Sequence, residues 1–96
     1  MKMGAVYRIV STPRFDREIE KLSEEDKEKV LDTIRILAEN PHYPSLRTKK
    51  YRKVYESSVN MDIRILWRFD EHPVIIALRV GHHNIVKKLN KRKSGL

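Results

Sequence analysis

The sequence predicts a single α+β domain in which one strand and two helices precede about four strands, most of them antiparallel. Apolar residues take every odd position from Val59 to Phe69, which is the period of a half-buried strand. The run Val74–Val80 is almost continuously apolar, which favours a strand covered on both faces near the middle of a sheet. Because Asp70–Pro73 is a turn, we expect an antiparallel hairpin in which Arg64 lies opposite residue 78 or 79.

The first part of the chain is expected to form a strand followed by a helix. The strand runs from Ala5 to Val10. Ser11-Thr12-Pro13 then supplies a hydroxyl cap and a proline suited to the first helical turn. Phe15, Ile19 and Leu22 follow at the spacing of one helical stripe, so this helix has an apolar face to bury.

A second helix is expected between Ser23 and Asn40. Ser23 caps its amino end, and the acidic residues of its first turn suit the positive end of the helix dipole. Pro41 ends it, because the residue before a proline is disfavoured in the helical region. Its apolar stripe comprises Val30, Leu31, Ile34, Leu37 and Ala38. Two helices with apolar stripes and a short link form a hairpin that needs a sheet to cover.

The remaining segments are short. Strands are expected from Leu46 to Lys50 and from Tyr51 to Ser58, ahead of the central hairpin. Asn84–Leu89 fits one or two turns of helix, and residues 90–96 form a basic tail. Residues 1–96 are therefore expected to make one domain.

Composition excludes several kinds of site. The chain has 96 residues and no cysteine, so disulfides, thiolate zinc sites and cysteine nucleophiles are excluded. A domain of this size has no room for a deep cofactor cleft, and no cofactor is expected. No amino-terminal apolar run precedes a cleavage site and no run has membrane-spanning length, so we expect a cytoplasmic protein that does not enter a membrane.

The positive charge is large and unevenly placed. The formal net charge is +8. Basic residues crowd the segment Arg47–Lys53 and recur from Arg79 to the carboxyl end, and neither segment contains an acid. Heat-adapted proteins are rich in lysine for other reasons, but that bias does not explain two acid-free clusters. The segregation indicates a polyanionic partner such as nucleic acid or the ribosome.

Arg64 and His83 are the leading candidates for chemistry. An arginine in the polar row of a core strand is rigidly held, and its guanidinium can bind two phosphate oxygens at once. A histidine can move a proton at neutral pH without a metal. Cleavage of RNA through its own 2′-hydroxyl needs a base, an acid and cations, whereas the nucleophile belongs to the RNA.

These residues also have purely structural interpretations. Asp62 and Arg64 lie two positions apart on one strand face and could simply pair with each other. Lys49 and Lys50 could form a solvated edge that discourages strand pairing.

Metal binding and base stacking are not expected at the two most obvious positions. His82 and His83 point to opposite faces if the strand continues, so they make a poor chelate, and no metal site is predicted. Trp67 falls in the apolar register and is expected in the core.

Three stretches carry a resemblance to a known family. They are Leu46–Lys50, Tyr55–Leu66 and Val80–His83, in this order after a strand and a helical hairpin. In them the chain resembles the RelE/ParE superfamily of type II toxin-antitoxin toxins, over residues 5 to 89. The resemblance implies a RelE-like α+β fold, with a curved, mainly antiparallel sheet of about four to five strands and the α-helical hairpin packed on one face. It also implies a cognate antitoxin protein as partner.

The resemblance implies two different activities. Members on the RelE side are ribosome-dependent endoribonucleases that cut mRNA in the decoding site without a metal, whereas ParE members share the fold and poison DNA gyrase. We expect an mRNA-cleaving toxin whose partners are the ribosome and mRNA, with a gyrase inhibitor as the alternative. A catalytically degenerate RNA-binding or ribosome-binding module is the other alternative, because Ser58 and Lys87 stand where many relatives have an arginine and an aromatic residue.

Individual roles follow from position. Arg64 matches the arginine that contacts the scissile phosphate, and His83 matches a position of proton transfer in YafQ-like members. Asp62 matches a catalytic aspartate of that group, and Lys49 and Lys50 fall where basic residues face mRNA or ribosomal RNA. These five are the expected catalytic residues. Further RNA contacts are expected from Arg47, Arg52, Lys53, Arg79, His82, Lys87 and Lys88.

Overall fold

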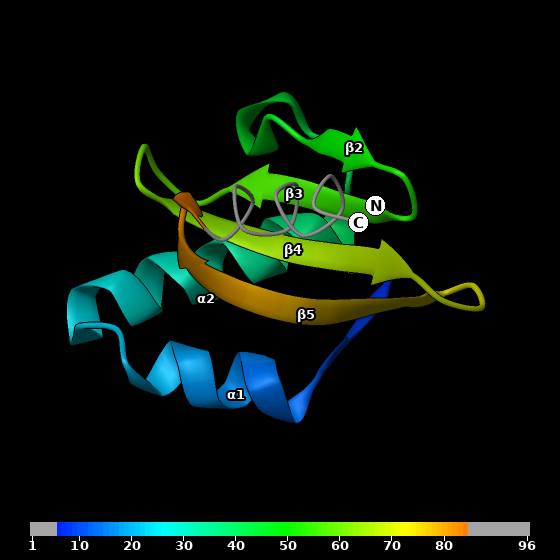
Figure 1. Cartoon of the computed structure of the whole chain (residues 1–96). Coiled ribbons are helices and arrows are strands. Elements are labelled where there is room, and N and C mark those ends of the chain that lie inside the picture. Colours follow the sequence, from blue (N-terminus) through cyan, green and yellow to red (C-terminus); the bar gives the residue numbers. More distant parts are fainter. Residues whose placement is uncertain (1–5, 85–96) are drawn as a thin grey trace, which may run out of the picture.

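The computed structural model describes residues 6–84, which form one helical layer on one sheet. The elements are β1 (Arg8–Ser11), α1 (Pro13–Glu20), α2 (Glu24–Glu39), the 3₁₀ turn η1 (Pro44–Leu46), β2 (Lys49–Tyr51), β3 (Val54–Ser58), β4 (Ile63–Phe69) and β5 (Val74–His82). The five strands lie in the order β1-β5-β4-β3-β2, with β1 parallel to β5 and the other pairs antiparallel. Figure 1 shows a curved sheet with both helices on the same side. The predicted fold class is confirmed.

The predicted caps are present at both helix starts. The Thr12 hydroxyl accepts a hydrogen bond from the backbone N–H of Phe15 at 3.0 Å. The Ser23 hydroxyl accepts one from the N–H of Asp26 at 3.1 Å. Each bond satisfies one amide that the first helical turn leaves unpaired. The last residue of α2 is Glu39, and Asn40 is its C-cap. The helix therefore ends just before Pro41, as expected.

Trp67 lies at the centre of the core. It is fully buried, its ring stacks on Tyr55 with centroids 4.6 Å apart, and its Nε1 donates to the Ser57 hydroxyl at 2.8 Å. Both the apolar area and the polar N–H of the indole are therefore accommodated. The buried apolar side chains of this core are Phe15, Val30, Leu37, Leu46, Ile63, Ile65, Trp67, Ile75, Ala77 and Val80.

The buried stripe of α2 differs from the predicted one at Leu31. This side chain is 52% exposed, whereas Thr33 is buried between Val30 and Leu37. The Thr33 hydroxyl donates to the carbonyl oxygen of Lys29 at 2.9 Å. A threonine that bonds its own helix in this way can be buried without losing a hydrogen bond. A stripe drawn from apolar residues alone therefore includes the wrong side chain.

The first strand is shorter than predicted and starts later, at Arg8 instead of Ala5, which lies outside the described residues. The N–H groups of Val6 and Tyr7 both donate to the carbonyl oxygen of Ala38, at 3.0 and 2.9 Å. This carbonyl lies in the last turn of α2, where it has no helical partner. The end of the second helix thus binds the segment that was expected to pair in the sheet.

The start of the central strand is also corrected. Met61 was expected on the buried face, but it is 90% exposed, and β4 begins only at Ile63. The Asn60 side-chain oxygen accepts hydrogen bonds from the N–H groups of Asp62 and Ile63, each at 2.8 Å. Asparagine commonly folds a turn in this way, so the odd-position pattern begins in this turn, ahead of the start of β4.

The pairing of the central hairpin is shifted from the predicted one. Arg64 lies opposite Gly81, not opposite residue 78 or 79. The turn accounts for one residue of this shift. A turn of Asp70–Pro73 alone would pair Phe69 with Val74, but Phe69 pairs with Ile75.

A bulge in β5 accounts for the other residue of the shift. Leu66 pairs with Arg79, but its neighbour Trp67 pairs with Ala77, so that Leu78 is an extra residue on β5. An extra residue of this kind reverses the side-chain alternation beyond it. Sequence periodicity does not reveal such a bulge, because the stretch before it, Val74–Ala77, is continuously apolar and shows no alternation.

The strand expected from Leu46 is displaced toward the carboxyl end. Leu46 belongs to η1 and is buried, while the strand itself is Lys49–Tyr51. Between them Arg47 has a left-handed backbone, with φ of 49°, which breaks the extended path. The helical turns predicted after Asn84 and the basic tail lie outside the described residues.

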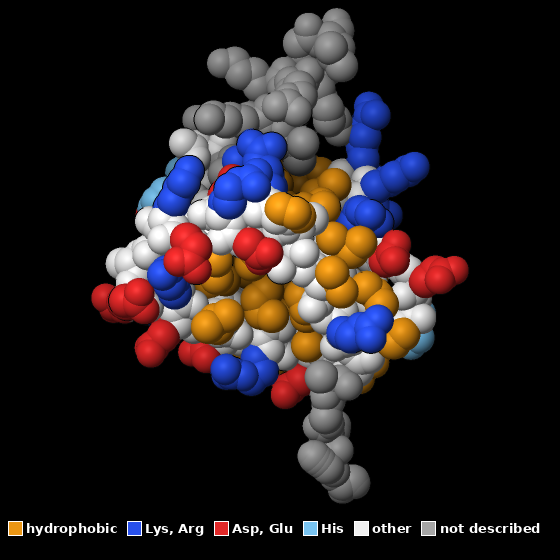
Figure 2. Space-filling view, turned by 90° about the horizontal axis from the view of Figure 1, so that it is seen from below, with side chains coloured by type: hydrophobic (Ala, Val, Ile, Leu, Met, Phe, Trp, Pro, Cys, Tyr) orange, Lys and Arg blue, Asp and Glu red, His pale blue; other side chains and the backbone are white. Residues whose placement is uncertain are grey.

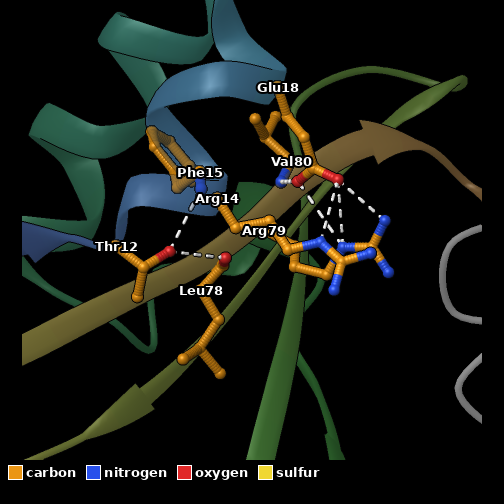
Figure 3. A network of polar contacts seen from close by, with 7 residues as sticks. All are labelled: Thr12, Arg14, Phe15, Glu18, Leu78, Arg79 and Val80. Carbon is orange, nitrogen blue, oxygen red and sulfur yellow. Dashed lines mark hydrogen bonds and ion pairs between the residues drawn. The ribbon is translucent and has the colours of Figure 1, made fainter.

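α1 covers the part of β5 that extends beyond β1 (Figure 3). The Thr12 hydroxyl donates to the carbonyl oxygen of Leu78 at 2.9 Å. The Glu18 carboxylate accepts the Val80 N–H at 3.1 Å and pairs with Arg79 at 2.7 Å. Side chains of a helix thus satisfy backbone groups that a sixth strand would otherwise have to pair.

This network makes the free energy of unfolding depend on pH in the acidic range. Burial alone would raise the pKa of Glu18, but the hydrogen bonds from Arg79 and Val80 and the charges of Arg79 and Arg14 outweigh it, so the pKa lies below 4.5. The ionised form is therefore favoured in the folded state. Its contribution to the free energy of unfolding is complete above the ordinary carboxyl range and is lost as the pH falls through the lowered pKa.

We expect Glu18→Gln to lower the free energy of unfolding at neutral pH by about 1–2 kcal/mol. It should also reduce the loss of stability between about pH 5 and pH 3, because the titrating group is gone. Urea unfolding across this range measures both effects. Glu20→Gln is the control, since Glu20 is an exposed residue of the same helix. Equal pH dependence in Glu18→Gln and the wild type would contradict the assignment.

Candidate functional site

An open cleft lies on the sheet face opposite the helices. Its volume is about 570 Å³. Residues of β2, β3, the β3–β4 turn, β4 and the end of β5 contribute to it, together with the segment before β2. The lining residues are Ser45, Arg47, Lys49, Tyr51, Glu56, Ser58, Val59, Asn60, Met61, Arg64 and His83. Three of the predicted functional cations and one predicted histidine therefore line one cleft, although they are far apart in the sequence.

The bulge in β5 determines which histidine reaches this cleft. Arg64 pairs with Gly81, and directly opposed residues of a sheet share a face. His82 pairs with Ile63 and so lies on the other face, while His83 follows on the face of Arg64. Without the extra residue the order would be reversed. The position of His83 in the cleft lining agrees with this alternation.

Arg64 is held in place by three contacts. Its Nε pairs with a carboxylate oxygen of Glu56 at 3.0 Å. Its Nη1 donates to the carbonyl oxygens of Asn60 at 2.7 Å and of Ile63 at 3.2 Å. The side chain is 19% exposed, so one side of the guanidinium is fixed against protein while part of it remains open to the cleft. A guanidinium fixed in this way is well suited to bind an oxyanion.

Glu56 contacts Arg64 within the cleft lining, and sequence reasoning did not select it as a site residue. It is buried at 6% exposure, and both of its oxygens are paired, one with Arg64 and the other with the Tyr51 hydroxyl at 3.2 Å. Burial, followed by the charge of Glu56 and the hydrogen bond to it, raises the pKa of Tyr51. The phenol therefore stays protonated at neutral pH and donates to the carboxylate. One signal was present: Glu56 is a lone acid beside the Arg47–Lys53 basic cluster.

The polar groups of the site are satisfied. Among residues 6–84, no buried side-chain nitrogen or oxygen lacks a hydrogen-bond partner. The same residues contain no group of three side chains placed to hold a metal ion. None of the helices described is long and apolar enough to cross a membrane.

A family model decides the relationship of the chain to known proteins. The model of the ParE toxin of type II toxin-antitoxin system, parDE, matches residues 9–86. The chain belongs to the ParE toxin family. The predicted membership of the RelE/ParE superfamily is confirmed.

Solved structures similar to this ParE-family toxin come from bacteria and an archaeon. In the toxin-antitoxin complex RelBE2 of Mycobacterium tuberculosis, the similar chain has a TM-score of 0.70 and 24% identity, with 84% of this chain and 94% of that chain covered. In the RelE-RelB complex of Pyrococcus horikoshii OT3, the similar chain has a TM-score of 0.71 and 17% identity, with 80% of this chain and 94% of that chain covered. In the DinJ-YafQ toxin-antitoxin complex of E. coli, the TM-score is 0.65 and the identity 11%, with 83% of this chain and 96% of that chain covered. At these identities the likeness shows a common fold. No curated protein sequence matches the chain.

The two adjacent lysines of the ParE-family toxin are separated by the sheet. Lys49 lines the cleft, whereas Lys50 points to the other face of β2, where its Nζ lies 5.7 Å from the centroid of the Tyr55 ring. Alternation along a strand requires this separation. Lys49 therefore lies on the same face of the sheet as Arg64, and Lys50 lies on the opposite face.

Asp62 does not pair with Arg64. Its carboxylate lies 2.7 Å from Nδ1 of His82, and both side chains are exposed and absent from the cleft lining. Arg79 pairs with Glu18 beside α1 and is likewise absent from the cleft. The structural alternative for Arg64 was thus right about an ion pair and wrong about the partner.

The other predicted RNA contacts divide into three groups. Arg47 lines the cleft. Arg52 and Lys53 are exposed in the turn between β2 and β3, outside the cleft lining. Lys87 and Lys88 lie outside the described residues. Ser58, which stands in place of a cation in many relatives, does line the cleft.

Proposed function

We propose that this ParE-family toxin is a ribosome-dependent, metal-independent endoribonuclease that cleaves mRNA in the decoding site through the RNA 2′-hydroxyl. The observation that supports it best is the convergence of Arg64, Lys49, Arg47 and His83 on one cleft. This set combines cations that can bind phosphate oxygens with an imidazole, which can serve as a general acid or base. Such groups suit a reaction that passes through a highly charged phosphorane.

Each residue is proposed to have a distinct role. The 2′-oxygen attacks the phosphorus and the bond to the 5′-oxygen breaks, so one proton leaves the 2′-hydroxyl and one is added to the 5′-oxygen. His83 serves one of these transfers as base or acid. Arg64 binds the phosphate oxygens, and Glu56 orients Arg64. Lys49 stabilises the negative charge that develops.

The two remaining catalytic candidates have a less direct part in this proposal. Lys50 and Asp62 line no part of the cleft. Lys50 would act by holding RNA beside the cleft. Asp62 would fix the end of the hairpin by pairing with His82, without taking part in cleavage.

An antitoxin protein is proposed as the partner that restrains the toxin in the cytoplasm. The M. tuberculosis structure is the toxin-antitoxin complex RelBE2, and the P. horikoshii structure is a RelE-RelB complex. On this chain, Val10 and Leu31 are large apolar side chains that remain 43% and 52% exposed. Figure 2 shows apolar side chains gathered in the middle of the face that carries α1, with acidic and basic side chains around them. Contiguous exposed apolar area is typical of protein interaction sites.

Inhibition of DNA gyrase is the second candidate. The observation that favours it is the family match, which is to ParE. A gyrase inhibitor would need no proton transfer, and the pairing of Arg64 with Glu56 would then be purely structural. A module that binds RNA or the ribosome without cutting is the third possibility, for which the missing cation at Ser58 is the argument.

Primer extension on a defined mRNA threaded on ribosomes tests the proposal. We expect the wild-type protein to produce cuts at the decoding site and to leave the same mRNA intact without ribosomes. The mRNA alone and ribosomes alone are the controls. Binding to ribosomes without cutting would contradict the nuclease and favour the RNA-binding module. Loss of supercoiling in a gyrase assay, with no cutting, would favour the ParE-type activity.

A further inference from the structure

A second pocket lies beside the cleft, on the other face of the edge strand β2. Its volume is about 380 Å³. It is lined by His42, Tyr43, Pro44, Arg47, Thr48, Lys50 and Tyr55. These residues come from the loop after α2, from η1 and the segment that follows it, and from β2 and β3. The roles proposed above for Arg47 and Lys50 do not explain why two tyrosines accompany these cations in one hollow.

The walls of the pocket are preorganised. The Tyr55 ring stacks on Trp67 with centroids 4.6 Å apart, and Lys50 lies 5.7 Å from the Tyr55 centroid. The loop is fixed as well, because the N–H of Tyr43 donates to the Asn40 carbonyl at 3.0 Å and the Leu46 N–H donates to the Tyr43 carbonyl at 3.0 Å. A site with fixed walls loses little entropy when a ligand enters.

The charge of the pocket favours an anion. Arg47 and Lys50 contribute two cations, His42 adds a further donor, and none of the lining residues is acidic. The cleft, by contrast, contains the carboxylate of Glu56. Tyr43 adds a ring that is 49% exposed, so a ligand in the pocket can reach it. Cations beside an exposed aromatic ring are the combination that binds single-stranded nucleic acid.

Arg47 connects the two hollows, because it lines both. Lys49 and Lys50 then continue the two linings on opposite faces of β2. β2 is the last strand of the sheet, so a chain that leaves the cleft can cross this edge without passing through the fold. Cations therefore lie on both sides of this edge, as a polyanion that bends around the strand requires.

We infer that the second pocket binds one unpaired RNA nucleotide adjacent to the one in the cleft, with its base on Tyr43 and its phosphate on Arg47 and Lys50. This inference rests on the proposed function, since it assumes that the cleft holds RNA. The nucleotide can belong to the mRNA or to ribosomal RNA, because both present the same base and phosphate. The pocket would hold and position RNA, and it would take no part in bond cleavage.

The test measures cleavage of ribosome-bound mRNA over a range of toxin concentrations. Tyr43→Ala and Lys50→Gln are each expected to raise the half-saturating concentration about tenfold, while the maximal rate changes by less than about twofold. Tyr43→Phe keeps the ring and should behave as the wild type. Lys21→Gln removes an exposed cation at the end of α1, outside both linings, and is the charge-matched control. Tyr43 is half exposed, so the variants are expected to fold, and circular dichroism checks this.

A second measurement identifies the source of the nucleotide. A single-stranded RNA of about six nucleotides, with 2′-O-methyl sugars that prevent cleavage, is titrated with toxin by fluorescence anisotropy. Weaker binding by Tyr43→Ala in this assay assigns the pocket to mRNA. A defect that appears only on ribosomes assigns it to ribosomal RNA. Variants that match the wild type in both assays would contradict nucleotide binding by the second pocket, and they would leave the proposed nuclease activity unaffected. A wild-type protein that neither binds nor cuts RNA would overturn the nuclease and the pocket together.

Discussion

Replacing His83 with alanine is expected to lower the rate of mRNA cleavage on ribosomes by about 10²- to 10⁴-fold, the usual contribution of a general acid or base. His83 is the histidine that the bulge in β5 places on the face of Arg64. Its loss removes a proton-transfer group and leaves the phosphate-binding cations in place. RNA binding should therefore change little. Single-turnover cleavage at saturating toxin separates the two effects.

His82→Ala is the matched control for this experiment. The two histidines are adjacent and both exposed, but His82 pairs with Asp62 and lies outside the cleft. We expect His82→Ala to retain most of the wild-type rate. If both variants lost the same activity, or if His83→Ala cut normally, the assignment of His83 would be wrong. Normal toxicity of His83→Ala with altered gyrase supercoiling would favour the alternative activity.

Replacing Trp67 with alanine is expected to lower the free energy of unfolding by about 3–5 kcal/mol. The indole is fully buried against Tyr55 and Phe69, so truncation leaves a cavity that the sheet cannot close. It also removes the hydrogen bond to Ser57. A domain of this size has a total stability of about 5–15 kcal/mol, so the variant should be largely unfolded at moderate urea concentrations. Urea unfolding followed by circular dichroism measures the change.

Trp67→Phe separates packing from hydrogen bonding. Phenylalanine keeps an aromatic ring beside Tyr55 but cannot donate to Ser57, so we expect a smaller loss than for alanine. The Ser57 hydroxyl retains its bond to Thr48 at 2.8 Å, which limits the cost of the missing donor. An alanine variant that unfolds at the wild-type urea concentration would show that the core does not depend on this ring.

Local signals were sufficient to predict most of the fold. Thr12 and Ser23 could be predicted as caps because capping depends on the residue and its immediate neighbours. The burial of Trp67 followed from alternation along one strand. Arg64 and His83 could be chosen as candidates because few residue types perform their chemistry.

Features that depend on contacts between distant segments could not be predicted in this way. The pairing of Arg64 with Glu56 depends on the register of β3 and β4, which no local pattern specifies. The exposure of Met61 follows from the Asn60 turn, whose signal was outweighed by the apolar alternation around it. The second pocket also depends on tertiary structure, since its residues come from three parts of the chain.

The bulge in β5 also has a consequence for the comparison of related sequences. In this chain the extra residue Leu78 decides whether position 82 or 83 shares a face with Arg64. A relative without the bulge would present the same chemical group from the preceding position. Two homologues with histidines in neighbouring alignment columns can therefore have equivalent sites, whereas two with histidines in the same column can differ. An insertion or deletion of one residue in this strand thus changes the site more than most substitutions would.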